Sequence, residues 1–462
     1  MRFRPRSLVG NSLGSVFASG TLILSAVFVP AILARGFTRP ELDLYMAAFA
    51  FVPAMLILPQ SHRAVSATQL NHLMAAEGQQ SAMRAFWRFT LGVGVLQLLL
   101  GLAGIAIYTS LYGSTQIGAA SLRTGLYCFL TYTLGVLAAG TVVAPAAAQH
   151  DFRPDNVAKL WPGLFQLIGL FAVWQAGLSD PLLWAFLVYL ASSWSIAIGL
   201  VFWVGLPGAP HGAGPDARAG DHSAEPLAAR HAAEGGPQPF LLKSLSGVVW
   251  WNLTAFLATT AAVMVVAVNH PGSLAPFSIA TSLLGIVSAG LIAISGPVAL
   301  HAASLLGSGP ERRRRFYLIV NSLFQGYILL AAAAVAFMPV WLFELWLNAE
   351  LAADVKLFSL LLLPASILRL LTMAFTIFVM SAGRQHTLWL SPLVEAVLSV
   401  AGAIVLGTLL GATGVPLALA LSAAIRLLIT ILHDSPRNRE ALGFGPREVL
   451  LPGWQLARAP RC

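Results

Sequence analysis

Charged residues are scarce in this sequence: Asp, Glu, Lys and Arg make up only 10% of its 462 residues. Soluble proteins contain about 25% charged residues, so a water-soluble globular domain of ordinary composition is excluded. Cysteine is scarcer still: the sequence has two, Cys128 within an apolar run and Cys462. Cysteines so few and so placed indicate no disulfide framework.

Long apolar runs dominate instead, and hydrophobic residues account for 57% of the chain. A run of about 20 apolar residues is long enough to cross a bilayer core of about 30 Å. We therefore predict an all-α polytopic membrane protein with about twelve transmembrane helices. The predicted spans are residues 8–34, 42–59, 89–112, 122–147, 160–177, 181–206, 244–268, 273–300, 316–341, 357–382, 388–410 and 415–433.

The net charge of +9 comes from basic residues that gather on one side of the predicted membrane. Of the 27 Lys and Arg residues, 21 fall in the termini and loops of that side, and four fall in the opposite loops. This distribution follows the positive-inside rule, so both termini are predicted to be cytoplasmic. It also explains the basic balance without nucleic acid.

Loop lengths define the predicted domains. The outward loops are short and hold no soluble catalytic domain, whereas one long Gly-, Pro- and Ala-rich segment has the composition of a flexible linker. Its His211, His222 and His231 lack the spacing of a helical metal-binding pair, so no metal site is expected. The predicted division is a six-helix lobe (1–206), a flexible cytoplasmic linker (207–242), a second six-helix lobe (243–433) and a cytoplasmic tail (434–462).

Equal numbers of spans on each side of the linker favour two parallel repeats, a common plan among transporters. The segment "RSLVG" enters the first span and "KSLSG" enters the seventh. Between the second and third spans, residues 64–89 have the pattern of an amphipathic helix on the membrane surface.

Polar residues recur within several spans at helical spacing, where positions three and four apart share a face. Lipid does not tolerate such stripes, so each is expected to face other helices or an aqueous path. Ser and Thr there favour close helix packing and interhelical hydrogen bonds. The candidate site residues are Asn11, Asn252, Ser366, Arg369, Thr372, Glu395, Ser399 and Arg426.

The charged members of this set carry most weight, because a charge at mid-bilayer costs at least about 2.5–3.5 kcal/mol. Arg369 is near the middle of its span, and Glu395 is expected to pair with Arg369 or Arg426. Two alternatives stay open: a buried ion pair that only sets packing, and an Arg426 that extends to the cytoplasmic interface. Because two arginines outnumber one carboxylate, and guanidinium suits phosphate or carboxylate oxygens, the cargo is expected to be an amphipathic anion.

The segment "SPLVEAVLSVAGAIVLGTLLGATGVPLALALSAAI" (391–425) resembles the last spans of bacterial oligosaccharide flippases, whose usual pattern runs "sP..Ea..n" and then "Ga.GValgt". Residues 365–392, 273–306 and 11–37 are similar to the family's preceding, eighth and first segments. These Wzx-like flippases belong to the multidrug/oligosaccharidyl-lipid/polysaccharide (MOP) exporter superfamily. Two departures stand out: Ser399 where the family often has Asn, and Asn252 in the region where an acidic residue is usual.

The resemblance implies two six-helix lobes facing a central cavity, and a cargo of undecaprenyl-diphosphate-linked oligosaccharide. The cargo would pass by alternating access from the cytoplasmic to the periplasmic leaflet of the bacterial inner membrane. No cofactor is expected; a proton or sodium gradient is the candidate energy source, with Glu395 as the candidate coupling residue. Expected partners are membrane lipids and a polysaccharide polymerase or export machinery for exopolysaccharide or O-antigen.

Three other functions remain as alternatives. A multidrug exporter of the superfamily would share the helix plan but would want acidic residues for cationic drugs. A lipid II flippase is closer in cargo but commonly has fourteen spans. A membrane glycosyltransferase or polymerase would need a large outward catalytic loop, and the short loops here favour a protein that is not an enzyme.

Overall fold

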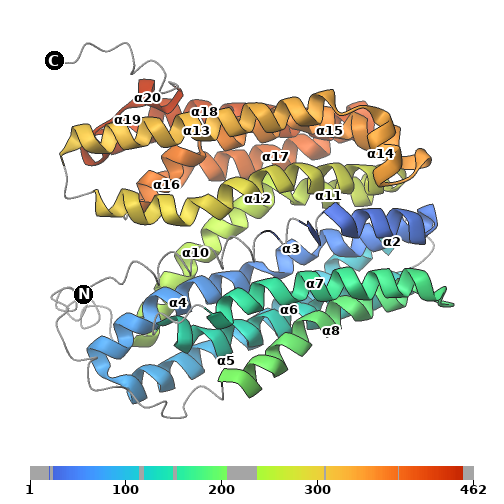
Figure 1. Cartoon of the computed structure of the whole chain (residues 1–462), viewed down its shortest axis with the longest axis horizontal. Coiled ribbons are helices and arrows are strands. Elements are labelled where there is room, and N and C mark those ends of the chain that lie inside the picture. The colour runs from blue at the N-terminus through green and yellow to red at the C-terminus, as the bar shows by residue number, and fades with distance from the viewer. Residues whose placement is uncertain are drawn as a thin grey trace. The chain divides into compact units, whose positions relative to one another are not determined.

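The computed structural model of the chain is helical throughout the residues that it describes, with no strand among them (Figure 1). The described residues are 20, 24–25, 27–113, 119–148, 153–204, 237–305, 309–382 and 384–450. Predicted span one (8–34) and Asn11 therefore lie largely or wholly outside the described residues. So do most of the predicted linker and the end of the predicted tail.

Within the described part of the chain, nine helical runs are long and apolar enough to cross a membrane, or ten if one bent pair is a single span. The last run, Leu390–Leu442, contains two antiparallel candidates, α17 (Leu390–Leu410) and α18 (Gly414–Ile429). Gly411 separates them with a φ of 71°, a conformation that residues other than glycine rarely adopt. The chain is a multi-pass helical membrane protein, as its apolar runs predict.

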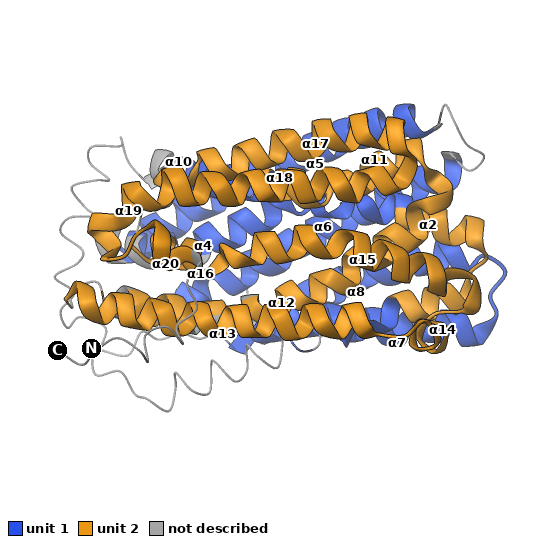
Figure 2. Cartoon of the chain, turned by 90° about the horizontal axis from the view of Figure 1, so that it is seen from above, with its two compact units in different colours: residues 1–29, 47–253 blue, residues 30–46, 254–462 orange. Residues whose placement is uncertain are grey.

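The chain forms two compact units, coloured separately in Figure 2. Unit 1 comprises residues 1–29 and 47–253. Its helices are α3 (Val52–Met55), α4 (Ile57–Glu77), α5 (Gln79–Gly113), α6 (Ala119–Ala148), α7 (Arg153–Ala176), α8 (Pro181–Val204) and most of α10 (Pro237–Thr259).

Helix α6 lies at the centre of unit 1 and packs against α4, α5, α7 and α8. Glycine permits the closest approach: a Cβ atom on Gly125 would meet the Phe186 ring, and one on Gly135 would meet the Ser193 side chain. Small residues at helix contacts are the usual solution in membranes, where dispersion contacts replace the hydrophobic effect. The position of α6 thus follows from its small residues.

Unit 2 comprises residues 30–46 and 254–462. Helix α18 packs against both α15 and α17, and α15 also packs against α12 and α13. After α2 (Arg39–Ala50), which begins in this unit, its elements are α11 (Ala261–Asn269), η2 (Pro271–Ser273), α12 (Leu274–Ser304), α13 (Pro310–Phe337), α14 (Val340–Trp346), α15 (Ala349–Leu371), α16 (Met373–Ser381), η3 (Gln385–Leu388), α17, η4 (Gly411–Thr413), α18, the π-helix η5 (Thr430–Asp434), α19 (Ser435–Leu442) and α20 (Pro446–Leu450).

The two units exchange two segments relative to the predicted division at the linker. Residues 30–46 join unit 2, where Asn348 Nδ2 donates to Ala34 O at 2.7 Å and Ala275 N donates to Asp43 Oδ1 at 3.0 Å. Residues 237–253 of α10 join unit 1, because Leu241 and Leu245 are buried in its apolar core. These segments are assigned by their hydrogen bonds and buried side chains. The lengths of the apolar runs in the sequence give no information on such contacts.

The residues after α18, predicted as a tail, fold onto unit 2. The Phe444 ring stacks on Tyr317 of α13 with centroids 3.9 Å apart. Arg313 Nη1 donates to Ala441 O at 2.6 Å, and Arg314 pairs with Glu448 at 3.1 Å. Residues 435–450 therefore form two short helices, α19 and α20, with a three-residue connection, and they pack on unit 2.

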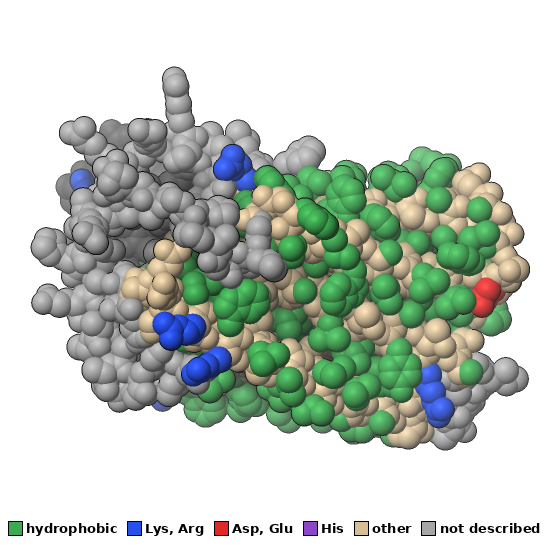
Figure 3. All heavy atoms as spheres, turned by 90° about the horizontal axis from the view of Figure 1, so that it is seen from below, with side chains coloured by type: hydrophobic (Ala, Val, Ile, Leu, Met, Phe, Trp, Pro, Cys, Tyr) green, Lys and Arg blue, Asp and Glu red, His purple; other side chains and the backbone are tan. Residues whose placement is uncertain are grey.

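The predicted surface helix 64–89 is instead the continuation of two spans. Helix α4 runs on to Glu77, α5 starts at Gln79, and Gly78 joins them with a φ of 80°. The face drawn in Figure 3 has hydrophobic side chains over most of its described surface, and its charged side chains are few and lie toward two ends. Such a surface suits lipid.

Candidate functional site

Glu395 is fully buried on the inner face of α17. The face repeats at helical spacing through Ser391, Glu395, Ser399, Ala403 and Gly407, all of which are buried. Small side chains on either side of Glu395 let neighbouring helices approach closely and leave room for two long guanidinium side chains. The sequence of α17 thus places one carboxylate on the buried face of this helix.

Both oxygens of Glu395 accept a hydrogen bond from an arginine. Arg369 Nε of α15 lies 2.5 Å from Oε1, and Arg426 Nη1 of α18 lies 2.6 Å from Oε2. We call these three residues the Arg–Glu–Arg triad. The triad joins α15, α17 and α18. The sequence predicts that Glu395 pairs with Arg369 or Arg426, and in the structure it pairs with both.

Arg369 also holds a backbone carbonyl. Its Nη2 lies 2.5 Å from the carbonyl oxygen of Ala258, near the end of α10. Arg369 also lies close to a break between two helices, because α15 ends at Leu371 and α16 begins after Thr372. The Thr372 hydroxyl donates to the Arg369 carbonyl at 2.9 Å, which satisfies that end of α15.

The triad has a net charge of +1, with one carboxylate between two guanidinium groups. The Glu395 side chain is 0% exposed, whereas Arg369 and Arg426 are 15% and 18% exposed, so surface access is confined to the arginines. Arg426 Nε is buried and has no hydrogen-bond partner among the described residues. The arrangement can offer N–H donors and positive charge to an anion.

A buried hydroxyl pair extends this face of α17. The Ser399 and Ser422 hydroxyl oxygens lie 2.7 Å apart, and Ser422 also donates to Leu419 O of its own helix at 3.0 Å. This pair connects α17 to α18 by a hydrogen bond between helices.

The other predicted site residues do not join the triad. Ser366 is half-buried on α15, whereas Asn252 lies in unit 1, where its Nδ2 donates to Ser61 Oγ at 2.9 Å. Asn11 lies outside the described residues. The predicted set thus divides into a cluster in unit 2 and one described residue in unit 1.

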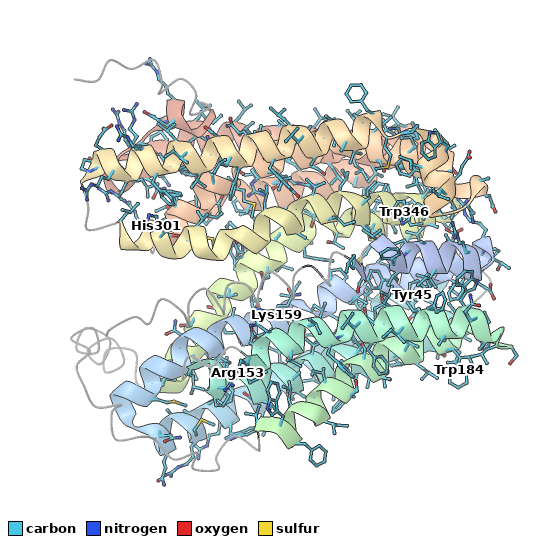
Figure 4. The ribbon with its side chains drawn as sticks, in the orientation of Figure 1. Tyr45, Arg153, Lys159, Trp184, His301 and Trp346 are labelled. Atoms are coloured by element: carbon cyan, nitrogen blue, oxygen red, sulfur yellow. The ribbon has the colours of Figure 1, made fainter. Side chains whose placement is uncertain are left out.

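Unit 1 holds an ion cluster that the sequence analysis did not single out. Asp155 of α7 accepts from Arg63 Nε at 3.0 Å and from Lys159 Nζ at 2.7 Å. Figure 4 labels Lys159, along with Arg153, on the first turns of α7. Arg63 and Lys159 belong to the basic residues predicted on the cytoplasmic side, and Asp155, four positions before Lys159, is the sequence signal of an ion pair.

No group of three or more His, Cys, Asp or Glu residues among those described could hold a metal ion.

Comparison with known proteins rests on structure, since no family model matches the sequence and no curated protein is significantly similar to it. An inward-facing multidrug resistance MATE family transporter of the MOP superfamily superposes with a TM-score of 0.71 at 12% identity, over 94% of this chain and 99% of that one. The lipid II flippase MurJ, in an inward closed conformation, gives 0.59 at 14% identity, over 91% and 86%.

A third similar structure is a MOP superfamily transporter from Pyrococcus furiosus, whose reversed binding-pocket polarity is described as suggesting a different function. It gives a TM-score of 0.57 at 12% identity, over 95% of this chain and 96% of that one. At such low identities the likeness is one of fold. The chain has the fold of the MOP superfamily transporters, as the resemblance of its motifs implied.

Proposed function

We propose that this protein is a flippase that moves an undecaprenyl-diphosphate-linked oligosaccharide from the cytoplasmic to the periplasmic leaflet of a bacterial inner membrane. The observation that carries the proposal is the net-positive Arg–Glu–Arg triad within a MOP fold. A diphosphate headgroup cannot cross hydrocarbon unaided, because burying its charge is too costly. Guanidinium groups are the side chains best matched to its oxygens.

In this proposal the cargo diphosphate competes with Glu395 for the arginines. Glu395 balances Arg369 and Arg426 while the cargo is absent, which keeps two buried cations paired. Asn11, Asn252, Ser366, Thr372 and Ser399 remain proposed contacts of the sugar or of the transport path. A proton or sodium gradient is the proposed energy source. Glu395 would serve as coupling group by releasing one arginine when its charge is neutralised.

The sign of the triad favours this proposal over multidrug export. A site for cationic drugs would gain from unpaired carboxylates, whereas Glu395 has both oxygens engaged by arginine. Lipid II export is the second candidate, supported by the structural likeness to MurJ. Its cargo shares the lipid diphosphate, so the glycan distinguishes the two.

The decisive experiment is a lipid extraction. The gene is deleted in its host, and lipid-linked glycans and surface polysaccharide are analysed together in the deletion strain and after complementation. The proposal expects a complete lipid-linked repeat unit to accumulate while the surface polymer disappears. Accumulated lipid II would favour the second candidate, and unchanged lipid and polymer pools would refute both.

Complementation with site variants connects this phenotype to the triad. Arg369→Ala should fail to restore the polymer although the variant reaches the membrane in normal amount, because its cargo contact is lost. Glu350→Gln is the control, since the Glu350 side chain is 66% exposed and lies outside the triad. Full restoration by Arg369→Ala would reduce the triad to a packing element.

A further inference from the structure

The span formed by α10 and α11 is sharply bent. The axes of residues Ser244–Thr259 and Ala261–Asn269 meet at 42°. Kinks above about 20° arise almost always at Pro, at Gly/Ser pairs, at π-bulges or where a side chain or water enters the backbone hydrogen-bond ladder. The stretch "AFLATTAAVM" (255–264) contains no proline and no glycine. A side chain is therefore the cause to look for.

Arg369 is the side chain at this bend. Its Nη2 contacts the carbonyl oxygen of Ala258, a residue only 2% exposed. In a straight α-helix that oxygen accepts from the N–H group four residues later, on Ala262. A guanidinium that draws the carbonyl outward competes with this bond, and inside a membrane protein no bulk water replaces the lost partner.

A second contributor lies beside it. The Thr259 hydroxyl donates to Ala255 O at 2.7 Å, and such bonds to the preceding turn bend helices slightly. This local bond is independent of Arg369, so the two causes can be separated by mutation.

We propose that Arg369 is a positioning residue that sets the bend of α10–α11 through its hydrogen bond to the Ala258 carbonyl. We further propose that an anion that binds the Arg369 guanidinium breaks this hydrogen bond and lets the helix straighten. The second half rests on the proposed function, because it takes the cargo diphosphate as the anion. Arg369 Nε is engaged by Glu395 and Nη2 by Ala258, so a diphosphate that binds this Nε–Nη2 edge of the guanidinium in the bidentate manner displaces these contacts. The bend lies just after the point at which α10 passes from unit 1 to unit 2. Occupation of the triad would thereby change the direction of a helix that both units share.

The test is a distance measurement by electron spin resonance in nanodiscs. Spin labels are placed at Trp250→Cys, which is exposed on α10, and at Asn269→Cys, exposed at the end of α11, with Cys128 and Cys462 changed to Ser. At 1.5 Å of rise per residue, straightening a bend of 42° lengthens this separation by about 2 Å. Thermal unfolding of each variant shows whether it is folded.

Arg369→Lys should lengthen the distance by about 2 Å without any ligand, because one ammonium group satisfies Glu395 but lacks the second arm that reaches Ala258. Arg369→Gln should do the same. Arg426→Lys is the matched control, since Arg426 contacts the same carboxylate from α18, and should leave the distance unchanged. Lengthening in Thr259→Val but in neither Arg369 variant would overturn the assignment.

The anion is then supplied as undecaprenyl diphosphate, with retention of radiolabelled lipid measured on the same protein and inorganic pyrophosphate as the lipid-free arm. In the protein with native Arg369, the distance between the spin labels should increase by a similar amount when the lipid binds. In Arg369→Lys this distance should not increase further. Retention without lengthening would overturn the release while leaving the proposed cargo intact. Absence of retention would refute both cargo and release, and the ligand-free variants would still decide whether Arg369 sets the bend.

Discussion

Arg426 Nη1 lies 2.6 Å from Oε2 of Glu395, on the oxygen opposite to the one that Arg369 occupies. One carboxylate is thereby shared between two helices, α15 and α18, that also pack against each other. Removing Glu395 leaves two guanidinium groups without their carboxylate, whereas removing either arginine leaves Glu395 paired with the other, and the following expectations rest on that asymmetry.

Glu395→Gln should destabilise the protein strongly. An amide cannot balance two guanidinium groups, and breaking a buried ion pair costs about 3–5 kcal/mol. We expect a large fall in melting temperature in detergent together with loss of polysaccharide export in cells. Glu350→Gln, at a largely exposed side chain, should change stability by less than about 1 kcal/mol. Equal melting temperatures for both variants would contradict the role given to the triad.

Arg426→Lys should separate charge from geometry. Lysine keeps the pairing with Glu395 but loses the planar donors that suit a diphosphate. Because a hydrogen bond to a charged group contributes about 1.5–3 kcal/mol, we expect at least about a tenfold loss of transport in reconstituted vesicles, with a melting temperature close to native. Native transport by this variant would indicate that Arg426 acts only through its charge.

The Ser399–Ser422 pair should show energetic coupling. Its hydroxyl oxygens lie 2.7 Å apart in a buried contact between α17 and α18. Ser399→Ala, Ser422→Ala and the double variant form a thermodynamic cycle. Interhelical hydrogen bonds in membrane proteins average about 0.6 kcal/mol, so we expect coupling of that order. Ser282, whose hydroxyl bonds to Ser278 O within its own helix, should show no coupling to Ser422.

Gly411→Ala should destabilise the connection between α17 and α18. Gly411 has a φ of 71° and a ψ of −163°, a region that residues with a Cβ atom avoid, at a cost of about 1–3 kcal/mol. The matched control is Gly199→Ala, inside α8, where an added Cβ meets nothing within 4 Å. That substitution should stabilise the protein by about 0.5–1 kcal/mol. An opposite order of melting temperatures would contradict this expectation.

The helical spans follow from the sequence because twenty apolar residues have few alternatives in a membrane. Predicted spans at 122–147, 181–206 and 388–410 correspond closely to α6, α8 and α17. The charged candidates Arg369, Glu395 and Arg426 were also visible, since charge inside an apolar run is costly enough to need a partner.

Features that depend on contacts between distant residues could not be predicted from the sequence. Nothing in the residues around Thr260 predicts a 42° bend, and the contact that the Ala258 carbonyl makes there with Arg369 comes from a helix more than a hundred positions later. The sequence predicts Arg63 only as one of the basic residues on the cytoplasmic side, whereas in the structure it pairs with Asp155 of α7 within unit 1. Apolar run length reports where a helix crosses the membrane and carries no information on which side chains meet.

The folded segment after α18 has a practical consequence for protein engineering. Tyr317 and Phe378 lie against Phe444, and Asn321 Nδ2 donates to Val449 O at 3.1 Å. Truncation at residue 433 would therefore uncover an aromatic surface and leave polar groups of α13 without their partners. Affinity tags and reporter fusions should be attached beyond residue 450, so that the packing of residues 435–450 on unit 2 is preserved.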